Sequence, residues 1–294
     1  MFAEDLVVAT SIIGVLSLLA FLCGSRARPE SKGLFVTTIL TAFIFSVCFQ
    51  GKLGWARLVP HSSAVQFSNL TPILVAFIAG FARRGLDLRQ QTRPFAVTAL
   101  LLLAVACLVS PIMRSAVAPP TVAAISKTNG FLVLQSHDST CAPASAASLL
   151  RFHGIDSDEA AMIGPCLTSQ FGTEALGLYR GITIGCEGTS CNVELASRDQ
   201  HRWKSAGQLP NIALVRFSEN EYETGLNLNS PQRPRSQPQW FTGSNGAEDG
   251  HAVVVLGYQD GRWSIADPAI GLVTWSDAEL ASRFTGDAIY ITRP

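Results

Sequence analysis

The stretch LQSHDSTCAPASAASLLRFHG, Leu134–Gly154, decides how this chain is interpreted. It begins inside an apolar run that predicts a strand ending at Gln135, and it continues through a polar turn to Cys141. Pro143 and the helix formers after it predict a helix that stops at Gly154, because proline is favoured in a first helical turn and glycine just after the last. Cys141 is therefore expected at a helix N-terminus, where the helix dipole favours the thiolate, the nucleophilic form of cysteine.

A second informative stretch is GHAVVVLGYQDGRWSIADPAIG, Gly250–Gly271. His251 opens an apolar run, Ala252–Leu256, that predicts a buried strand, and a turn region separates it from a second strand over Arg262–Ala266. Two strands joined by a turn place the start of one beside the end of the other, so His251 and Asp267 are expected to lie close together. An imidazole base with an orienting carboxylate is what a cysteine nucleophile requires.

These residues resemble the C39 family of cysteine peptidases, through Gln135 six residues before Cys141 and through His251 and Asp267 later in the chain. The resemblance covers roughly residue 131 to the C-terminus. It implies a papain-like fold in which Cys141 is the nucleophile, His251 the base, Asp267 the orienting acid and Gln135 an oxyanion donor. The best-known members cleave leader peptides after a Gly-Gly pair and are often fused to ABC transporters. Ala142 departs from the glycine that usually follows the cysteine in that family.

The chain has 294 residues, 48% hydrophobic and 15% charged, with no net charge, so nothing suggests a nucleic-acid partner. Its apolar residues are concentrated in four uncharged stretches, each near the ~17–25 residues that a membrane-spanning helix needs. The stretches are residues 6–23, 34–50, 64–82 and 94–113. We expect four transmembrane helices in a lipid bilayer, with three as the alternative, since polar residues weaken the start of the third. Acidic Glu4 and Asp5 do not fit the basic start of a signal peptide.

The positions of lysine and arginine predict the orientation of these helices. The loops after the first and third stretches contain seven of them: Arg26, Arg28, Lys32, Arg83, Arg84, Arg89 and Arg93. The opposite side has four: Lys52, Arg57, Arg114 and Lys127. The bias predicts an integral protein of the bacterial inner (plasma) membrane, with both termini and Cys141 on the periplasmic or extracytoplasmic side.

The expected organisation is a transmembrane region over residues 1–114, a linker over 115–129 and a peptidase domain over 130–294. Within the last part, short helices are predicted over Asp156–Ile163 and Thr173–Arg180, a tight loop over Gly185–Val193 and a strand over Pro210–Phe217. Helices followed by strands indicate an α+β domain. The polar segment Ser218–Asp249 is either a mobile insert or a flap that ends beside His251.

Other cysteines and histidines need separate interpretations. If the domain lies outside the cytoplasm, Cys186 and Cys191 are candidates for a disulfide, with Cys166 as an alternative partner for either. A zinc site built on Cys186, Cys191 and His201 lacks the usual paired ligand spacing. His137, His153 and His201 are rival bases, but His251 is preferred because it opens a buried strand and has Asp267 near it.

The sequence therefore predicts a membrane-anchored cysteine peptidase that acts on a polypeptide, in leader or precursor processing, through Cys141, His251, Asp267 and Gln135. It needs no cofactor and no metal, and the absence of a G-x-x-x-x-G-K-[ST] loop means that a transporter would be a separate partner. Two other classes stay open: a thiol acyltransferase (transamidase) using the same chemistry, and a non-catalytic peptide-binding or sensory membrane module.

Overall fold

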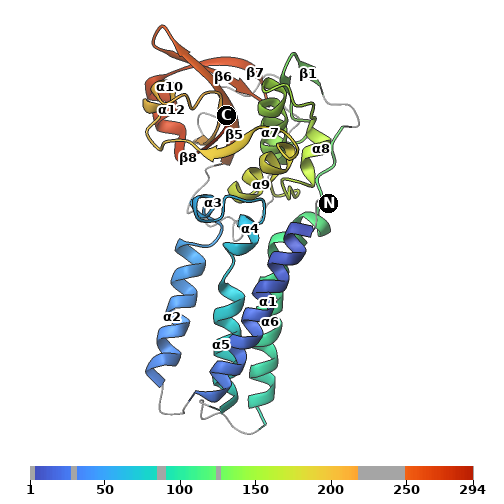
Figure 1. Ribbon diagram of the computed structural model, residues 1–294, viewed down its shortest axis with the longest axis vertical. Helices are drawn as coiled ribbons and strands as arrows, with labels where there is room; N and C mark the ends of the chain where they lie inside the picture. The colour runs from blue at the N-terminus through green and yellow to red at the C-terminus, as the bar shows by residue number, and fades with distance from the viewer. Residues whose placement is uncertain (1–3, 28–31, 85–90, 124–126, 218–248, 294) are drawn as a thin grey trace. The chain divides into compact units, whose positions relative to one another are not determined.

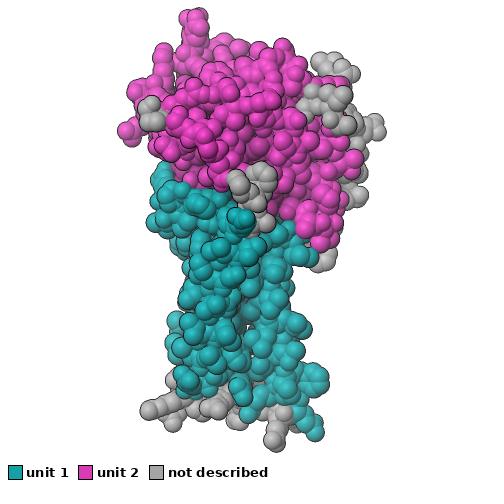
Figure 2. All heavy atoms as spheres, turned by 45° about the vertical axis from the view of Figure 1, so that its right-hand side comes forward, with its two compact units in different colours: residues 1–114 teal, residues 115–294 magenta. Residues whose placement is uncertain are grey.

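The structure of this chain is a computed structural model that describes residues 4–27, 32–84, 91–123, 127–217 and 249–293 (Figure 1). The chain divides into two compact units, Met1–Arg114 and Ser115–Pro294, which are coloured separately in Figure 2. The first unit is helical, and the second combines helices with antiparallel sheet. Each unit has its own hydrophobic cluster, so the two are described in turn.

The described residues of the first unit form helices whose closest packing is between the first and the fifth. They are α1 (Glu4–Arg26), α2 (Lys32–Cys48), α3 (Trp55–Leu58), α4 (Ala64–Phe67), α5 (Thr71–Arg84) and α6 (Arg93–Val117). A Cβ atom added to Gly24 of α1 would lie 2.3 Å from the carbonyl oxygen of Phe77, and one added to Gly80 of α5 would lie 2.1 Å from that of Phe21. Glycine at both positions therefore lets the two backbones approach, as in many helix contacts inside membranes.

Three stretches of the described chain are long and apolar enough to cross a membrane: Glu4–Arg26, Ala64–Arg83 and Arg93–Val117. The expectation of four spans is thus met for three, and the stretch 34–50 is not shown to span. Helix α2 has 17 residues, about 25 Å of length against a hydrocarbon core of about 30 Å. It ends at Cys48 because a turn follows in which Gly51 takes a left-handed φ of 71°.

Two polar residues that weaken the third apolar stretch are buried and hydrogen-bond carbonyls of α6 close to Pro111. Pro111 has no N–H, so the carbonyl of Cys107, four residues earlier, lacks its helical partner. The side-chain amide of Asn69 donates to that carbonyl at 2.6 Å, and the amide of Gln66 donates to the carbonyl of Leu108 at 2.9 Å. The break between α4 and α5 therefore positions two amides against the proline-containing part of α6.

The second unit is an α+β domain, as the sequence predicts. Its six-stranded sheet has the order β3-β8-β4-β5-β6-β7, with every neighbouring pair antiparallel, and β1 and β2 form a separate pair. The strands are β1 (Thr128–Asn129), β2 (Leu132–Val133), β3 (Asn192–Leu195), β4 (Asn211–Phe217), β5 (Asp249–Gln259), β6 (Arg262–Asp267), β7 (Gly271–Ser276) and β8 (Phe284–Thr292). The helices are α7 (Cys141–Phe152), α8 (Glu159–Ile163), α9 (Ala175–Gly185), α10 (Arg202–Ser205) and α12 (Asp277–Arg283).

Helix α7 begins at Cys141 and ends at Phe152, with His153 as its C-cap and Gly154 next, as the sequence predicts. A short 3-10 helix, η1 (Asp138–Thr140), leads into it, and Pro143 occupies its first turn. Gly154 has a φ of 73°, a left-handed conformation that glycine adopts without strain and that ends the helix. Every residue of Ala142–Leu150 is buried, so α7 is a central element with Cys141 at its N-terminal end.

The two shorter helices differ from their predicted ranges at their starts. The helix expected over Asp156–Ile163 begins at Glu159, because the side chain of Asp158 accepts a hydrogen bond from the backbone of the first turn. The helix expected over Thr173–Arg180 begins two residues late, and Thr173 does not cap it. It runs on through Gly185, so part of the expected loop is helical, and the remainder leads into the unpredicted strand β3.

The β5–β6 hairpin forms where the sequence predicts two strands joined by a turn. Val254 pairs with Ala266, and the strands are joined by Asp260 and Gly261, both with positive φ, at 51° and 77°. Two such residues form a type I′ turn, whose twist matches that of the flanking strands. Strand β5 runs to Gln259, longer than expected, because the chain turns only at this Asp-Gly pair.

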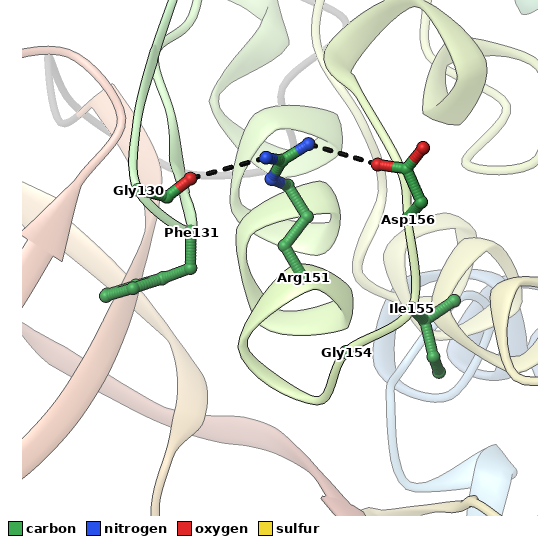
Figure 3. A pocket seen from close by; sticks show the side chains of 6 residues that line it. All are labelled: Gly130, Phe131, Arg151, Gly154, Ile155 and Asp156. Carbon is green, nitrogen blue, oxygen red and sulfur yellow. Dashed lines mark hydrogen bonds and ion pairs between the residues drawn. The ribbon is translucent and has the colours of Figure 1, made fainter.

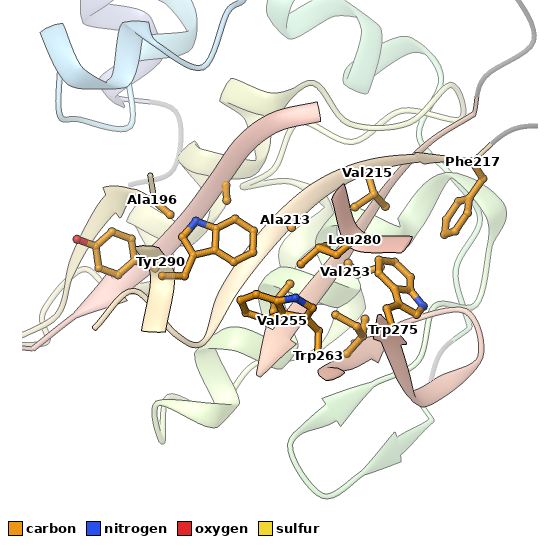
Figure 4. Packing of buried hydrophobic residues seen from close by; sticks show 13 residues of the cluster. Ala196, Ala213, Val215, Phe217, Val253, Val255, Trp263, Trp275, Leu280 and Tyr290 are labelled. Atoms are coloured by element: carbon orange, nitrogen blue, oxygen red, sulfur yellow. The ribbon is translucent and has the colours of Figure 1, made fainter. Parts of the chain in front are cut away.

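The sheet is buried on both faces, which explains the continuous apolar run in β5. Val253 and Val255 belong to a cluster around Trp203, Trp263 and Trp275 (Figure 4). Ala252 and Val254 are equally buried but lie outside that cluster. Successive side chains of a strand point to opposite faces of the sheet, so Ala252 and Val254 face the side on which α7 contacts β5. Helix α7 is thereby held against the strand that carries His251.

Candidate active site

Cys141 occupies the first position of α7, at the N-terminus of the helix, and is a partly exposed residue. The backbone N–H groups of a first helical turn have no partner within the helix and face an approaching negative charge. Ala142 follows it and is only 5% exposed, so its methyl group is directed into the protein interior. The placement favours a thiolate at the sulfur of Cys141.

His251 and Asp267 lie side by side across the β5–β6 hairpin. The imidazole Nε2 of His251 is 2.9 Å from Oδ1 of Asp267, and both residues are buried. The same carboxylate oxygen accepts a hydrogen bond from the backbone N–H of Ala269 at 2.8 Å, which holds it in place. With Nε2 engaged, the other ring nitrogen, Nδ1, is left for the thiol of Cys141, with which His251 forms a hydrogen bond.

The charges of Cys141 and His251 stabilise each other. Burial opposes ionisation of the thiol, but the hydrogen bond and positive charge of His251, with the N–H of Ala252, outweigh it and lower the pKa of Cys141. Burial also opposes protonation of the imidazole, but the Asp267 carboxylate outweighs it, and together with Cys141 raises the pKa of His251 to about 10. Both shifts favour a thiolate beside an imidazolium, the reactive form of a nucleophilic cysteine.

Ser145 ties α7 to the strand that carries the histidine. One turn after Cys141, its hydroxyl donates to the carbonyl oxygen of Ala252 at 2.9 Å, and it is fully buried. Ala252 directly follows His251, and its N–H also bonds the sulfur of Cys141. The separation of Cys141 and His251 is therefore held through both the N–H and the carbonyl of Ala252. The sequence contains no signal for this contact, because its partners are 107 residues apart.

Gln135 lies beside the carboxylate end of this arrangement. Its backbone N–H donates to the carbonyl of Pro268, the residue after Asp267, at 2.8 Å. Its side-chain Nε2 donates to the carbonyl of His137 at 3.2 Å, which leaves the second hydrogen of the amide uncommitted by this bond. The structure thus brings Gln135 to the Asp267 turn, while its amide is hydrogen-bonded within the loop that leads to Cys141.

The rival histidines have other surroundings. His137 caps η1, with Nδ1 2.9 Å from the hydroxyl of Ser139. His153 follows the last turn of α7, and His201 precedes α10. Helix α7 has 12 residues, about 18 Å of length, so its C-terminal end is far from the sulfur of Cys141. Of the five histidines in the chain, the structure places His251 against Cys141.

The remaining cysteines of this unit are free thiols in the described structure. Cys166 is fully buried against α9, where a Cβ atom added to Gly181 would lie 2.2 Å from its sulfur. Cys186 and Cys191 flank the turn between α9 and β3, and burial, together with the nearby Cys191, raises the pKa of Cys186 to about 12. The described residues contain no group of three or more metal-ligating side chains. The expected flap lies outside the described residues over 218–248.

A surface hollow of about 350 Å³ lies at the opposite end of α7 (Figure 3). It is lined by Gly130, Phe131, Arg151, Gly154, Ile155 and Asp156. Arg151 crosses it, bonded to the carbonyl of Gly130 at 3.3 Å and to the carboxylate of Asp156 at 3.2 Å. The hollow is therefore separated from Cys141 by the length of the helix and contributes nothing to the chemistry there.

Residues 122–285 of the chain match the Peptidase_C39 like family. The curated proteins include no match. Among solved structures, the peptidase domain of Streptococcus ComA, a bi-functional ABC transporter involved in a quorum sensing pathway, is similar with a TM-score of 0.39 and 22% identity, over 56% of this chain and 100% of that one. A double glycine motif protease from an AMS/PCAT transporter, in complex with the leader peptide, is similar with a TM-score of 0.38 and 18% identity, over 60% of this chain and 95% of that one. The peptidase domain of Streptococcus mutans ComA is similar with a TM-score of 0.35 and 20% identity, over 55% of this chain and 98% of that one.

Proposed function

Because the chain belongs to the Peptidase_C39 like family, we propose that it is a membrane-anchored cysteine peptidase that hydrolyses peptide bonds of a polypeptide substrate. The observation that carries the proposal is the buried His251, which is 2.9 Å from the Asp267 carboxylate and hydrogen-bonded to Cys141. A lowered thiol pKa and a raised imidazole pKa in one pair are characteristic of an activated nucleophile.

The proposed reaction begins with the thiolate of Cys141, which attacks the carbonyl carbon of the scissile peptide. The side-chain amide of Gln135 and a backbone N–H at the start of α7 stabilise the oxyanion, a contribution of about 3–4 kcal/mol per donor in well-studied hydrolases. His251, held by Asp267, donates its proton to the leaving amine. The neutral imidazole then accepts a proton from a water molecule, whose oxygen attacks the thioester carbonyl. The carboxylic acid product leaves, and the thiolate of Cys141 and the imidazolium of His251 are restored.

We extend the proposal to four membrane spans, with α2 as the short one. Large apolar side chains of α2 are exposed, including Phe43 at 68% and Val47 at 60%. Water disfavours such a surface, whereas lipid accommodates it, and a bilayer adapts to a short helix at a modest cost. Four spans also place the N-terminus and the Cys141 unit on the same side.

The proposed side is extracytoplasmic, which is the periplasm in a bacterium with two membranes. Seven lysines and arginines lie in the loops after α1 and α5 or at the helix ends that border them, against four near the other face, and the side richer in them is retained in the cytoplasm. The substrate is then an exported or membrane-bound polypeptide. Leader or precursor processing, with a separate transporter as partner, is the specific role proposed from the family resemblance.

The test compares the full chain in detergent with its Cys141→Ala and His251→Ala variants on a peptide library read by mass spectrometry. The parent is expected to hydrolyse responsive peptides, and both variants are expected to lose at least a thousandfold in rate while keeping the near-UV circular dichroism of the parent. Equal cleavage by Cys141→Ala refutes the peptidase. Amine-linked products in place of hydrolysed ones indicate a transamidase, and a Cys141 inert to iodoacetamide indicates a binding module.

A further inference from the structure

Glu159 is a fully buried carboxylate that none of the proposed steps uses. It is the first residue of α8, and its Oε1 oxygen points at the turn that leads into Cys141. The backbone N–H of Ser136 donates to this oxygen at 2.8 Å, and the hydroxyl of Thr140 donates to the same oxygen. One oxygen therefore holds both ends of the turn Ser136–Thr140.

The Ser136–Thr140 turn also hydrogen-bonds the side-chain amide of Gln135. Thr140, also fully buried, shares its hydroxyl hydrogen between Glu159 and the carbonyl of His137, 2.7 Å away, and accepts from the N–H of His137 at 3.2 Å. The carbonyl of His137 then accepts from Nε2 of Gln135 at 3.2 Å. A continuous chain of hydrogen bonds runs from Glu159 through Thr140 and His137 to the side chain of Gln135.

We propose that Glu159 is the positioning residue for the oxyanion donor Gln135, a role that rests on the proposed peptidase function. An apolar side chain in its place would remove the acceptor of the Ser136 N–H and leave the hydroxyl of Thr140 with the carbonyl of His137 as its remaining acceptor. The turn would then move to find other partners, and the His137 carbonyl that orients the Gln135 amide would move with it. The effect reaches the substrate only through Gln135.

The nucleophile and base are held by different contacts. Ser145 clamps α7 to the peptide after His251, and Asp267 orients the imidazole. The backbone of Gln135 is fixed independently, by its N–H on the carbonyl of Pro268. Loss of Glu159 is therefore expected to disturb acyl transfer, which develops an oxyanion, and to spare simple alkylation of Cys141, which does not.

The experiment measures two reactions of the full chain in detergent: acylation of Cys141 by a p-nitrophenyl ester and its alkylation by iodoacetamide, both quantified on the Cys141 peptide. Glu159→Leu removes both acceptor oxygens at nearly constant volume. Asp158→Ala is the matched control, because Asp158 caps the same helix, accepting from Ala161 N at 2.7 Å, without a bond to the turn. Glu159→Gln keeps one acceptor oxygen and serves as the conservative variant.

Glu159→Leu is expected to slow acylation at least tenfold while alkylation stays within twofold of the parent. Asp158→Ala is expected to lower the melting temperature and leave both rates unchanged, and Glu159→Gln to recover most of the acylation lost in Glu159→Leu. A Glu159→Leu protein that is acylated as fast as the parent overturns the proposal, as does one whose alkylation falls in parallel with acylation.

If Glu159→Leu fails to fold, Thr140→Val tests the same chain of bonds from the other side, with Thr140→Ser as its conservative counterpart. Slow acylation in Thr140→Val, recovered in Thr140→Ser, supports the proposal, and equal rates in all three proteins overturn it. A parent that is alkylated but acylated no faster than Cys141→Ala has no oxyanion site, which refutes the proposed function and this role together. An active parent with an active Glu159→Leu refutes the role alone.

Discussion

Asp267→Asn removes one charge from the proposed active site and preserves the shape of the side chain. Burial lowers the pKa of His251, and the Asp267 carboxylate is the largest of the effects that instead raise it to about 10. Without that charge the imidazolium is lost near neutral pH, and Cys141 loses the cation that lowers its own pKa. With the imidazolium gone, burial keeps the pKa of the Cys141 thiol at or above its ordinary value of about 8.5–9, so at most about 1–3% of it is ionised at pH 7 and its alkylation should slow by roughly tenfold or more there.

The assay is the rate of Cys141 alkylation by iodoacetamide between about pH 5.5 and 10, with the full chain in detergent and the Cys141 peptide quantified by mass spectrometry. In the parent, the lowered thiol pKa keeps the thiolate to a lower pH than in the variant, and reactivity falls as the pH drops through that lowered value. In Asp267→Asn the rate should rise steadily with pH and meet that of the parent above about pH 9. Proteolysis of a peptide substrate should fall in the same variant but not disappear, because orientation is lost and the base remains.

A matched control is Asp277→Asn, which removes another carboxylate of the same unit. Asp277 accepts hydrogen bonds from Tyr258 at 2.8 Å and Trp263 at 2.7 Å, away from the cysteine. This variant should keep the profile of the parent. A flat profile in Asp267→Asn would refute the reasoning, since the thiolate would then owe nothing to the carboxylate.

Two further predictions concern the membrane and the insert. A reporter active only outside the cytoplasm, fused after Pro294, should be active, and a cytoplasm-only reporter should be silent; the reverse pattern would mean three spans or an inverted bundle. Deletion of part of Ser218–Asp249 should change peptide selectivity more than the melting temperature, because this polar segment has little apolar surface to bury; a large drop in melting temperature with unchanged selectivity would make it part of the core.

Local chemistry accounts for the parts of the structure that could be predicted. Pro143 and Gly154 bound the helix that starts at Cys141, because both act within a single turn of backbone. Asp260 and Gly261 form the tight turn that sets the register of the β5–β6 hairpin. That register brings His251 to Asp267, so the proximity of base and carboxylate followed from a short segment of chain.

Tertiary structure decided the contacts whose partners are distant in the sequence. The hydroxyl of Ser145 donates to the carbonyl of Ala252, 107 residues away, and the amide of Asn69 donates to the carbonyl of Cys107, 38 residues away, which lacks its helical N–H donor because of Pro111. Glu159 resembles an ordinary acid in a first helical turn until folding buries it beside the loop before Cys141. Whether such a polar group is buried depends on the hydrogen-bond partner that folding brings to it. The periodicity of the sequence does not predict that partner. The closeness of His251 and Asp267 was therefore readable from residue type and spacing, whereas the bonds that tie Cys141 and His251 together exist only once the helices have packed against the sheet.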